Sequence, residues 1–214
     1  MAKREKLTRE KIVKVAMTML DAEGEAGFSM RKLAGELGVD PMAIYHHHAN
    51  RNALIVEVLQ AFMEECDLPA PSGNWHADIR ELCQSLRRLA KRHPGIFRLY
   101  ETYDDWLPAE NRVHEAFHAI LLNAGFDRLT VVRGVRLLLT FTESFAVDEI
   151  AGWHDPFDAS DRAELMDMLS PDTHPTMIAL IDEIGAVEAD EDFAFGLNVL
   201  VRGLDEELRQ STPS

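Results

Sequence analysis

Residues 30–47 read MRKLAGELGVDPMAIYHH, and this stretch decides the fold of the chain around it. The small Ala34 lies inside a first helical segment, where a second helix can cross close to its backbone. Gly38 follows where the chain has to turn with a positive φ angle, which glycine adopts without strain. Apolar residues occupy the positions that hold two such helices together, namely Leu33, Leu37, Val39 and Ile44. The offsets between these features predict a helix-turn-helix.

Capping residues delimit the helices in and around this motif. Thr8, Ser29 and Asn50 each precede an apolar segment of helical period, and a side-chain oxygen at such a position satisfies the first free backbone N–H groups. Asp40 is followed by Pro41, the pair typical of a helix start. We therefore expect four N-terminal helices, of which the third is short and ends near residue 47.

Helical periodicity continues through the rest of the chain, and strand alternation is nearly absent, so the fold class is predicted to be all-α. The segment 129–150 is apolar nearly all round and is expected to be buried on several sides. Pro94-Gly95 is expected to end a helix, and residues 152–175 are expected to be the least ordered. We place domains at 1–52 and 53–214, with a Pro/Gly/Ser-rich turn at 68–73. The expected helices of the second domain are 75–93, 110–123, 129–150, 176–187 and 191–208.

Charge is distributed unevenly between these two domains. The 214 residues carry a net charge of −15, but residues 1–52 hold nine Lys and Arg against seven Asp and Glu. A near-neutral module attached to an acidic body fits a protein that meets phosphates at one end only. The two cysteines are too few for a disulfide scaffold, and we find neither a signal peptide nor a membrane span. A cytoplasmic protein is expected.

The N-terminal motifs resemble those of the tetracycline-repressor family. The resemblance is carried strongly by residues 8–62 and more loosely to about residue 208. It implies an all-helical protein, with a three-helix DNA-binding domain and a larger helical domain that binds a ligand and forms a homodimer. The matching segments are Ser29-Met30-Arg31-Lys32-Leu33-Ala34, Leu37-Gly38-Val39, Ile44-Tyr45 and Asn50-Arg51-Asn52-Ala53-Leu54.

The resemblance also implies that the short helix 41–47 enters the major groove of operator DNA. Tyr45 and His47 can hydrogen-bond phosphate, and Arg51 adds a positive charge beside them. Arg31 can reach a phosphate or a guanine edge. The apolar start of the helix can contact thymine methyl groups. The predicted DNA contacts are Arg31, Pro41, Met42, Ala43, Tyr45, His46, His47 and Arg51.

Two histidine patterns invite a metal interpretation. His46, His47 and His48 are consecutive, and successive helical residues point about 100° apart, so they cannot converge on one ion. His114 and His118 form an H-E-x-x-H pattern, which zinc hydrolases use with the glutamate as base. No third ligand is signalled, so we expect no metal and no cofactor, and a zinc hydrolase remains only an alternative.

The second domain is expected to hold a mostly apolar inducer pocket. Tetracycline-binding family members hold a magnesium chelate with polar groups where this chain has Asp67, Leu82 and Tyr100, so a more apolar ligand is favoured. Ordinary core packing would select many of the same side chains. The ligand contacts that the family resemblance implies are Leu82, Leu86, Tyr100, His114, Phe117, His118 and Phe141.

The function implied is that of a dimeric repressor, which a small molecule releases from its operator. Helices 129–150 and 191–208 of two subunits would form the dimer interface as a four-helix bundle. An activator of the same fold is the open alternative.

Overall fold

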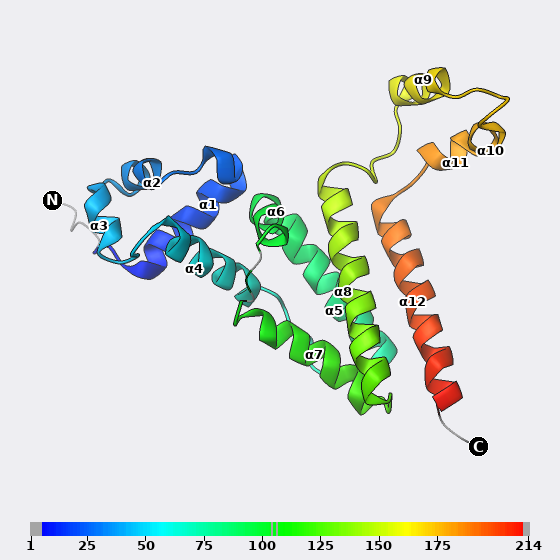
Figure 1. Cartoon of the computed structure of the whole chain (residues 1–214), viewed down its shortest axis with the longest axis horizontal. Helices are drawn as coiled ribbons and strands as arrows, with labels where there is room; N and C mark the ends of the chain where they lie inside the picture. Colours follow the sequence, from blue (N-terminus) through cyan, green and yellow to red (C-terminus); the bar gives the residue numbers. More distant parts are fainter. Residues whose placement is uncertain (1–5, 104, 106, 212–214) are drawn as a thin grey trace. The chain divides into compact units, whose positions relative to one another are not determined.

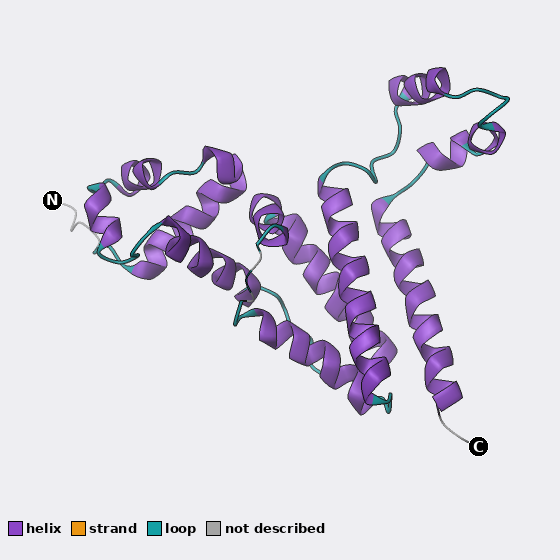
Figure 2. Cartoon of the chain, in the orientation of Figure 1, coloured by secondary structure: helices purple, strands orange, loops and turns teal. Residues whose placement is uncertain are grey.

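The computed structural model describes residues 6–103, 105 and 107–211. Over these residues the regular structure is entirely α-helical (Figure 2), as the periodicity predicts. They divide into two compact units, Met1–Leu139 and Thr140–Ser214, and each unit is treated by itself below. The helices (Figure 1) are α1 Arg9–Gly27, α2 Met30–Leu37, α3 Pro41–Tyr45, α4 Arg51–Glu64, α5 Trp75–Arg92, α6 Pro94–Glu101, α7 Glu110–Asn123, α8 Arg128–Ile150, α9 Ala159–Met168, α10 Pro175–Ala179, α11 Ile181–Gly185 and α12 Ala189–Ser211.

The predicted caps of the first four helices are all present. The Thr8 side chain accepts a hydrogen bond from the Lys11 backbone N–H, and Ser29 accepts one from that of Lys32. Asp40 caps α3, and Asn50 caps α4. These four side chains fix where each helix begins, and so they fix the lengths of the loops that join α1 to α4.

In the first unit, α1 packs against α2, α4 and α6, and α5 packs against α6 and α7. The approach of α6 to α1 is close enough to require a glycine. A Cβ atom on Gly95 would lie 2.4 Å from the carbonyl oxygen of Leu20. Beside this contact the Phe62 ring meets Phe97 and Tyr100, with centroids 6.4 and 5.8 Å away. The helix-turn-helix is thus built onto α6 through α1 and α4.

The second unit contains the C-terminal part of α8 together with α9 to α12. Its aromatic centre is Phe193, whose ring lies 5.3 Å from that of Phe141 and 5.1 Å from that of Phe145. Gly196 allows this packing, since a Cβ there would lie 2.5 Å from the Phe141 ring.

Three elements differ from the prediction. Pro94-Gly95 ends α5 but also begins α6, because proline is well suited to the first turn of a helix. Part of the segment expected to be least ordered forms α9, which Asp158 and Asp161 start with a reciprocal capping box. The apolar α8 was expected to be buried on several sides, but in the single chain part of its apolar surface is exposed. Its exposed apolar side chains are Leu129, Val132 and Leu137.

None of the helices that the structure describes combines the length and the apolar character needed to cross a bilayer.

Candidate DNA-binding surface and ligand-binding region

The turn of the helix-turn-helix has the geometry that its residues require. Gly38 adopts φ 64° and ψ 36°, the left-handed conformation that ends α2. The Val39 N–H donates to the Ala34 carbonyl at 3.0 Å, which closes the turn. Leu33 and Ile44 are fully buried and lock α2 to α3. The relative orientation of the two helices is therefore fixed by short-range packing.

The recognition helix α3 leaves a mostly uncovered face. Met42 is 62% exposed and Tyr45 41% exposed, while Ile44 between them is fully buried. His46 is also exposed, and Pro41, Ala43 and His47 are partly exposed. Met42, Tyr45 and His46 on this face are therefore accessible to a partner molecule.

The two arginines predicted to contact DNA have different surroundings. Arg31 is exposed on α2. Arg51 donates a hydrogen bond to a Glu25 carboxylate oxygen at 3.0 Å, and its guanidinium carbon lies 5.7 Å from the centre of the Phe28 ring. In the free chain Arg51 is thus held against the C-terminal part of α1, beside the recognition helix.

The sequence analysis did not predict a group of three hydrogen-bonded side chains, His48, Glu57 and Arg9, that joins the helix-turn-helix to α1 and α4. His48 is 1% exposed, and its Nε2 lies 3.0 Å from a carboxylate oxygen of Glu57 on α4. Glu57 also pairs with Arg9 at the start of α1. Burial raises the pKa of Glu57, but the hydrogen bonds from Arg9 and His48 outweigh it and hold the pKa below its usual value.

His48 therefore belongs to the interior of the motif rather than to the row of exposed histidines. Its Nδ1 is the buried side-chain atom that, among the described residues, has no hydrogen-bond partner. Because Nε2 faces a carboxylate, that nitrogen carries the proton. The signal in the sequence was its position four residues after the buried Ile44, whose carbonyl oxygen accepts a hydrogen bond from the His48 N–H at 2.9 Å.

The predicted ligand contacts of the first unit differ in how far their side chains are buried. Leu82 and Leu86 on α5 and Phe117 on α7 are buried, and α5 packs against α7. Tyr100 on α6 is half-buried and hydrogen-bonds Glu110, a residue that the sequence analysis missed. Burial raises the pKa of Glu110 above its ordinary value. Phe141 belongs to the second unit and packs on Phe193 there.

His114 and His118 lie one turn apart on α7, with their rings stacked at 6.3 Å. Burial and the neighbouring His118 lower the pKa of His114. The Nδ1 of His118 lies 2.6 Å from the carbonyl oxygen of His114, so this ring is bonded to its own helix. In the described part of the chain no set of three His, Cys, Asp or Glu side chains is placed to hold a metal ion. The geometry gives the zinc-hydrolase alternative no support.

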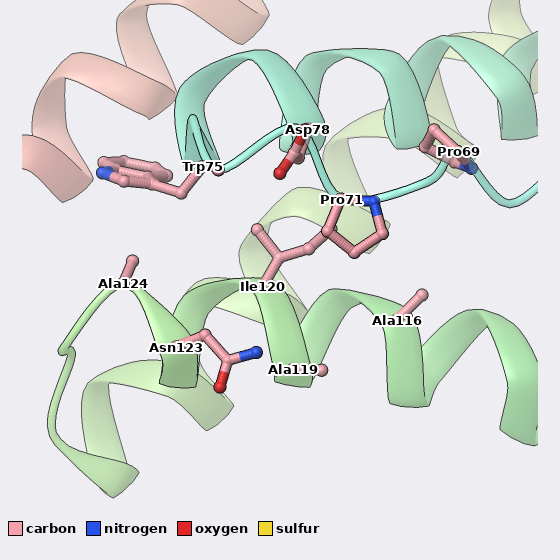
Figure 3. A pocket seen from close by; sticks show the side chains of 10 residues that line it. Pro69, Pro71, Trp75, Asp78, Ala116, Ala119, Ile120, Asn123 and Ala124 are labelled. Carbon is pink, nitrogen blue, oxygen red and sulfur yellow. The ribbon is translucent and has the colours of Figure 1, made fainter.

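The first unit also contains a cavity of about 230 Å³, between the segment that leads into α5 and the C-terminal half of α7 (Figure 3). None of the predicted ligand contacts forms part of its wall. It is lined by Pro69, Pro71, Gly73, Trp75, Asp78, Ala116, Ala119, Ile120, Asn123 and Ala124.

Comparison with known proteins places both parts of the chain in one family. Residues 12–58 match the family described as bacterial regulatory proteins, tetR family, and residues 68–208 match the tetracyclin repressor-like C-terminal domain. An HTH-type transcriptional regulator of Saccharopolyspora erythraea is 30% identical over 164 residues, which cover 76% of this chain and 69% of that protein. The class A tetracycline repressor from transposon 1721 of Escherichia coli is 26% identical and covers 93% of this chain and 91% of its own.

Solved structures agree with these matches over nearly the whole chain. The crystal structure of apo ActR from Streptomyces coelicolor superposes with a TM-score of 0.81 at 27% identity, and covers 96% of this chain and 98% of its own. The structure of ActR in complex with actinorhodin superposes with a TM-score of 0.80 at 28% identity, and covers 95% and 99%. The family resemblance and the fold class predicted from the sequence are confirmed, and the chain belongs to the tetracycline-repressor family of transcriptional regulators.

Proposed function

We propose that this chain represses transcription as a homodimer, which binds operator DNA through α3 and is released by a largely apolar small molecule. The observation that carries the proposal is the recognition helix itself. Its Ile44 side is locked into the motif, and its Met42 and Tyr45 sides are left open to solvent. A short helix presents few groups to base edges, so most of the affinity has to come from phosphate contacts around it.

The proposed phosphate contacts are Tyr45, His47 and Arg51, with Arg31 placed for a phosphate or a guanine edge. Arg51 begins α4, so its charge adds to the positive end of that helix. Pro41, Met42, Ala43 and His46 complete the proposed surface. The exposed carboxylate of Glu25, to which Arg51 is bonded, is the group that phosphate would replace.

The dimer is supported by apolar side chains that the single chain leaves uncovered. On α8, Leu129, Val132 and Leu137 are each about half exposed, at spacings that place them on one side of the helix. On α12, Phe195 is 73% and Val199 51% exposed, one turn apart. Such faces are unfavourable in water and favourable between two copies of a chain related by a twofold axis.

The proposed contacts of the inducer are the seven predicted ones. Support for an apolar ligand comes from the buried Leu82, Leu86 and Phe117. The related ActR was crystallised with actinorhodin, which makes a small organic ligand a reasonable class for this chain as well. Two recognition helices have to stand about 34–36 Å apart to reach successive major grooves. A ligand that prefers another spacing lowers operator affinity by its differential affinity for the two states.

The test is fluorescence polarisation with duplex DNA from around the protein's own gene, at several salt concentrations. Tyr45→Ala should weaken binding by about a hundredfold or more, since two hydrogen bonds to charged phosphate are removed in each dimer, at about 1.5–3 kcal/mol each. Arg51→Ala should in addition reduce the slope of log affinity against log salt by about one for each phosphate that the variant no longer neutralises. Arg98→Ala, an exposed arginine on α6, is the matched control and should leave both quantities unchanged.

Equal binding by all four proteins would contradict the proposed surface. A reporter gene under the same promoter then separates repression from activation. Its output should fall when the wild-type chain is supplied and recover with Tyr45→Ala. A rise on supplying the chain would favour the activator alternative.

A further inference from the structure

The cavity beside Trp75 lies on a different face of α7 from His114 and His118, two of the residues proposed to contact the inducer. Ala116, Ile120 and Asn123 recur at helical spacing and line the cavity. His114 and His118 lie roughly 160° away around the helix axis from Ala116, since each residue advances the helix by about 100°. A ligand in this cavity would therefore be separate from one held by the histidine face.

The wall opposite α7 is held in place by its own hydrogen bonds. Asp78 accepts from the backbone N–H of Ser72 at 3.0 Å and from its hydroxyl at 2.6 Å. Asn74 accepts from the first N–H groups of α5, and Gly73 takes a positive φ of 84° between them. This loop cannot simply collapse onto α7, so the cavity is a fixed feature of the first unit.

Small side chains on the other wall leave the space empty. Ala116, Ala119 and Ala124 face the cavity with single methyl groups, as Figure 3 shows. Pro71, Trp75 and Ile120 supply the larger apolar surfaces around it. The volume of about 230 Å³ is below the roughly 300–1,000 Å³ of pockets for drug-sized ligands. The space therefore fits a compound of one or two rings.

One charged group enters this apolar cavity. The Asp78 side chain is 7% exposed and points between α5 and α7 in Figure 3. A carboxylate has about four acceptor positions, and the hydrogen bonds described for Asp78 all come from Ser72. Its Oδ2 accepts only the longer of the two N–H contacts, at 3.2 Å. None of the described residues that line the cavity is positively charged. A buried carboxylate with spare acceptor positions favours a ligand that brings a cation.

We propose that this cavity is a second ligand site, which binds a small aromatic or aliphatic ring compound bearing a protonated amine. The ring lies among Pro71, Trp75 and Ile120, and the ammonium group donates to Asp78. The Asn123 amide, at the cavity edge, provides a further polar contact. The proposal does not require operator release, so its test and that of the proposed function can fail separately.

The experiment is isothermal titration of the full-length protein with three compounds of similar size. They are 2-phenylethylamine, which is a cation, 2-phenylethanol, which is neutral, and phenylacetate, which is an anion. The amine should bind once per chain and about tenfold to a hundredfold more tightly than the alcohol, because its hydrogen bond to the carboxylate is charge-assisted. The anion should not bind.

Three variants locate the binding. Asp78→Asn keeps an acceptor for Ser72 but removes the charge, and it should bring the amine down to the affinity of the alcohol. Ala119→Leu fills the cavity and should abolish binding of both, which tests the site even where Asp78→Asn disturbs the loop. Glu115→Gln removes one negative charge from an exposed position on α7 and should change nothing. The proposal is overturned by equal binding of amine and alcohol, by amine binding that survives Ala119→Leu, or by the absence of saturable binding.

Discussion

α6 approaches α1 so closely at Gly95 that the position has no room for a side chain. A methyl group there would lie 2.4 Å from the carbonyl oxygen of Leu20 and 2.8 Å from the Cα of Asp21. Both are backbone atoms, which cannot rotate out of the way as a side chain would. In Gly95→Ala the two helices therefore have to separate by at least about 0.6 Å, the shortfall from the 3.0 Å below which Cβ contacts are essentially never found.

Separation of the helices strains the groups that join them. Asp21 accepts from the backbone N–H of Ile96 at 3.2 Å and pairs with Nδ1 of His93 at 2.5 Å. Overpacking costs about 1–3 kcal/mol, and each weakened hydrogen bond costs up to about 0.5–1.5 kcal/mol. The gain in helix propensity from glycine to alanine returns at most about 1 kcal/mol. We expect the free energy of unfolding to fall by about 2–4 kcal/mol.

Gly35→Ala is the matched control, because Gly35 lies in α2 with no atom within 4 Å of an added Cβ. The same substitution there should raise the free energy of unfolding by about 0.5–1 kcal/mol. Urea unfolding followed by far-ultraviolet circular dichroism, at one protein concentration, measures both values. A Gly95→Ala protein within about 0.5 kcal/mol of wild type would refute the reasoning, since it would mean that α6 moves away from α1 at no cost.

Three further predictions concern other parts of the chain. A double-mutant cycle of His48→Ala and Glu57→Ala should give a coupling of about 1–2 kcal/mol in urea unfolding, and a coupling below about 0.3 kcal/mol would remove His48 from the support of the motif. Burial and a neighbouring histidine lower the pKa of His114, so the unfolded chain binds the proton first as the pH falls below the ordinary value of 6.5. Stability should then decrease with falling pH from about 6.5, and His114→Gln should flatten the unfolding midpoint over that window; an unchanged slope would contradict this. Phe195→Arg should convert the proposed dimer to a monomer in sedimentation velocity, whereas Leu122→Arg, at a half-exposed apolar position of α7, should not.

The success of the sequence analysis in the first 60 residues has a local cause. Each cap acts within three residues of itself, so Thr8, Ser29, Asp40 and Asn50 could be identified from neighbours in the sequence alone. The same approach missed the start of α6 at Pro94-Gly95, because proline both interrupts one helix and suits the first turn of the next. Local patterns locate the break in the chain, but they do not decide whether a loop or a second helix comes after it.

The candidate sites were less predictable because they depend on distances between helices. The partner of His48 is nine residues away on α4, and Arg9 reaches the same carboxylate from α1. The cavity beside Trp75 exists only because the loop before α5 is held off α7. Alanines on α7 are as compatible with tight packing as with a hollow, so their spacing alone predicts neither.

The ion pair of Arg51 with Glu25 bears on whether this arginine can contact DNA at all. Both side chains are about half exposed, at 41% and 51%, and pairs of that kind contribute about 0–1 kcal/mol. A phosphate offers a charge-assisted bond of the same type and, in addition, the release of counterions from the duplex. We therefore expect phosphate to replace Glu25 at moderate salt. The contact over the Phe28 ring uses the face of the guanidinium rather than its N–H groups, and it can persist when Arg51 bonds to phosphate. The pair with Glu25 thus holds Arg51 near the recognition helix without excluding it from the DNA.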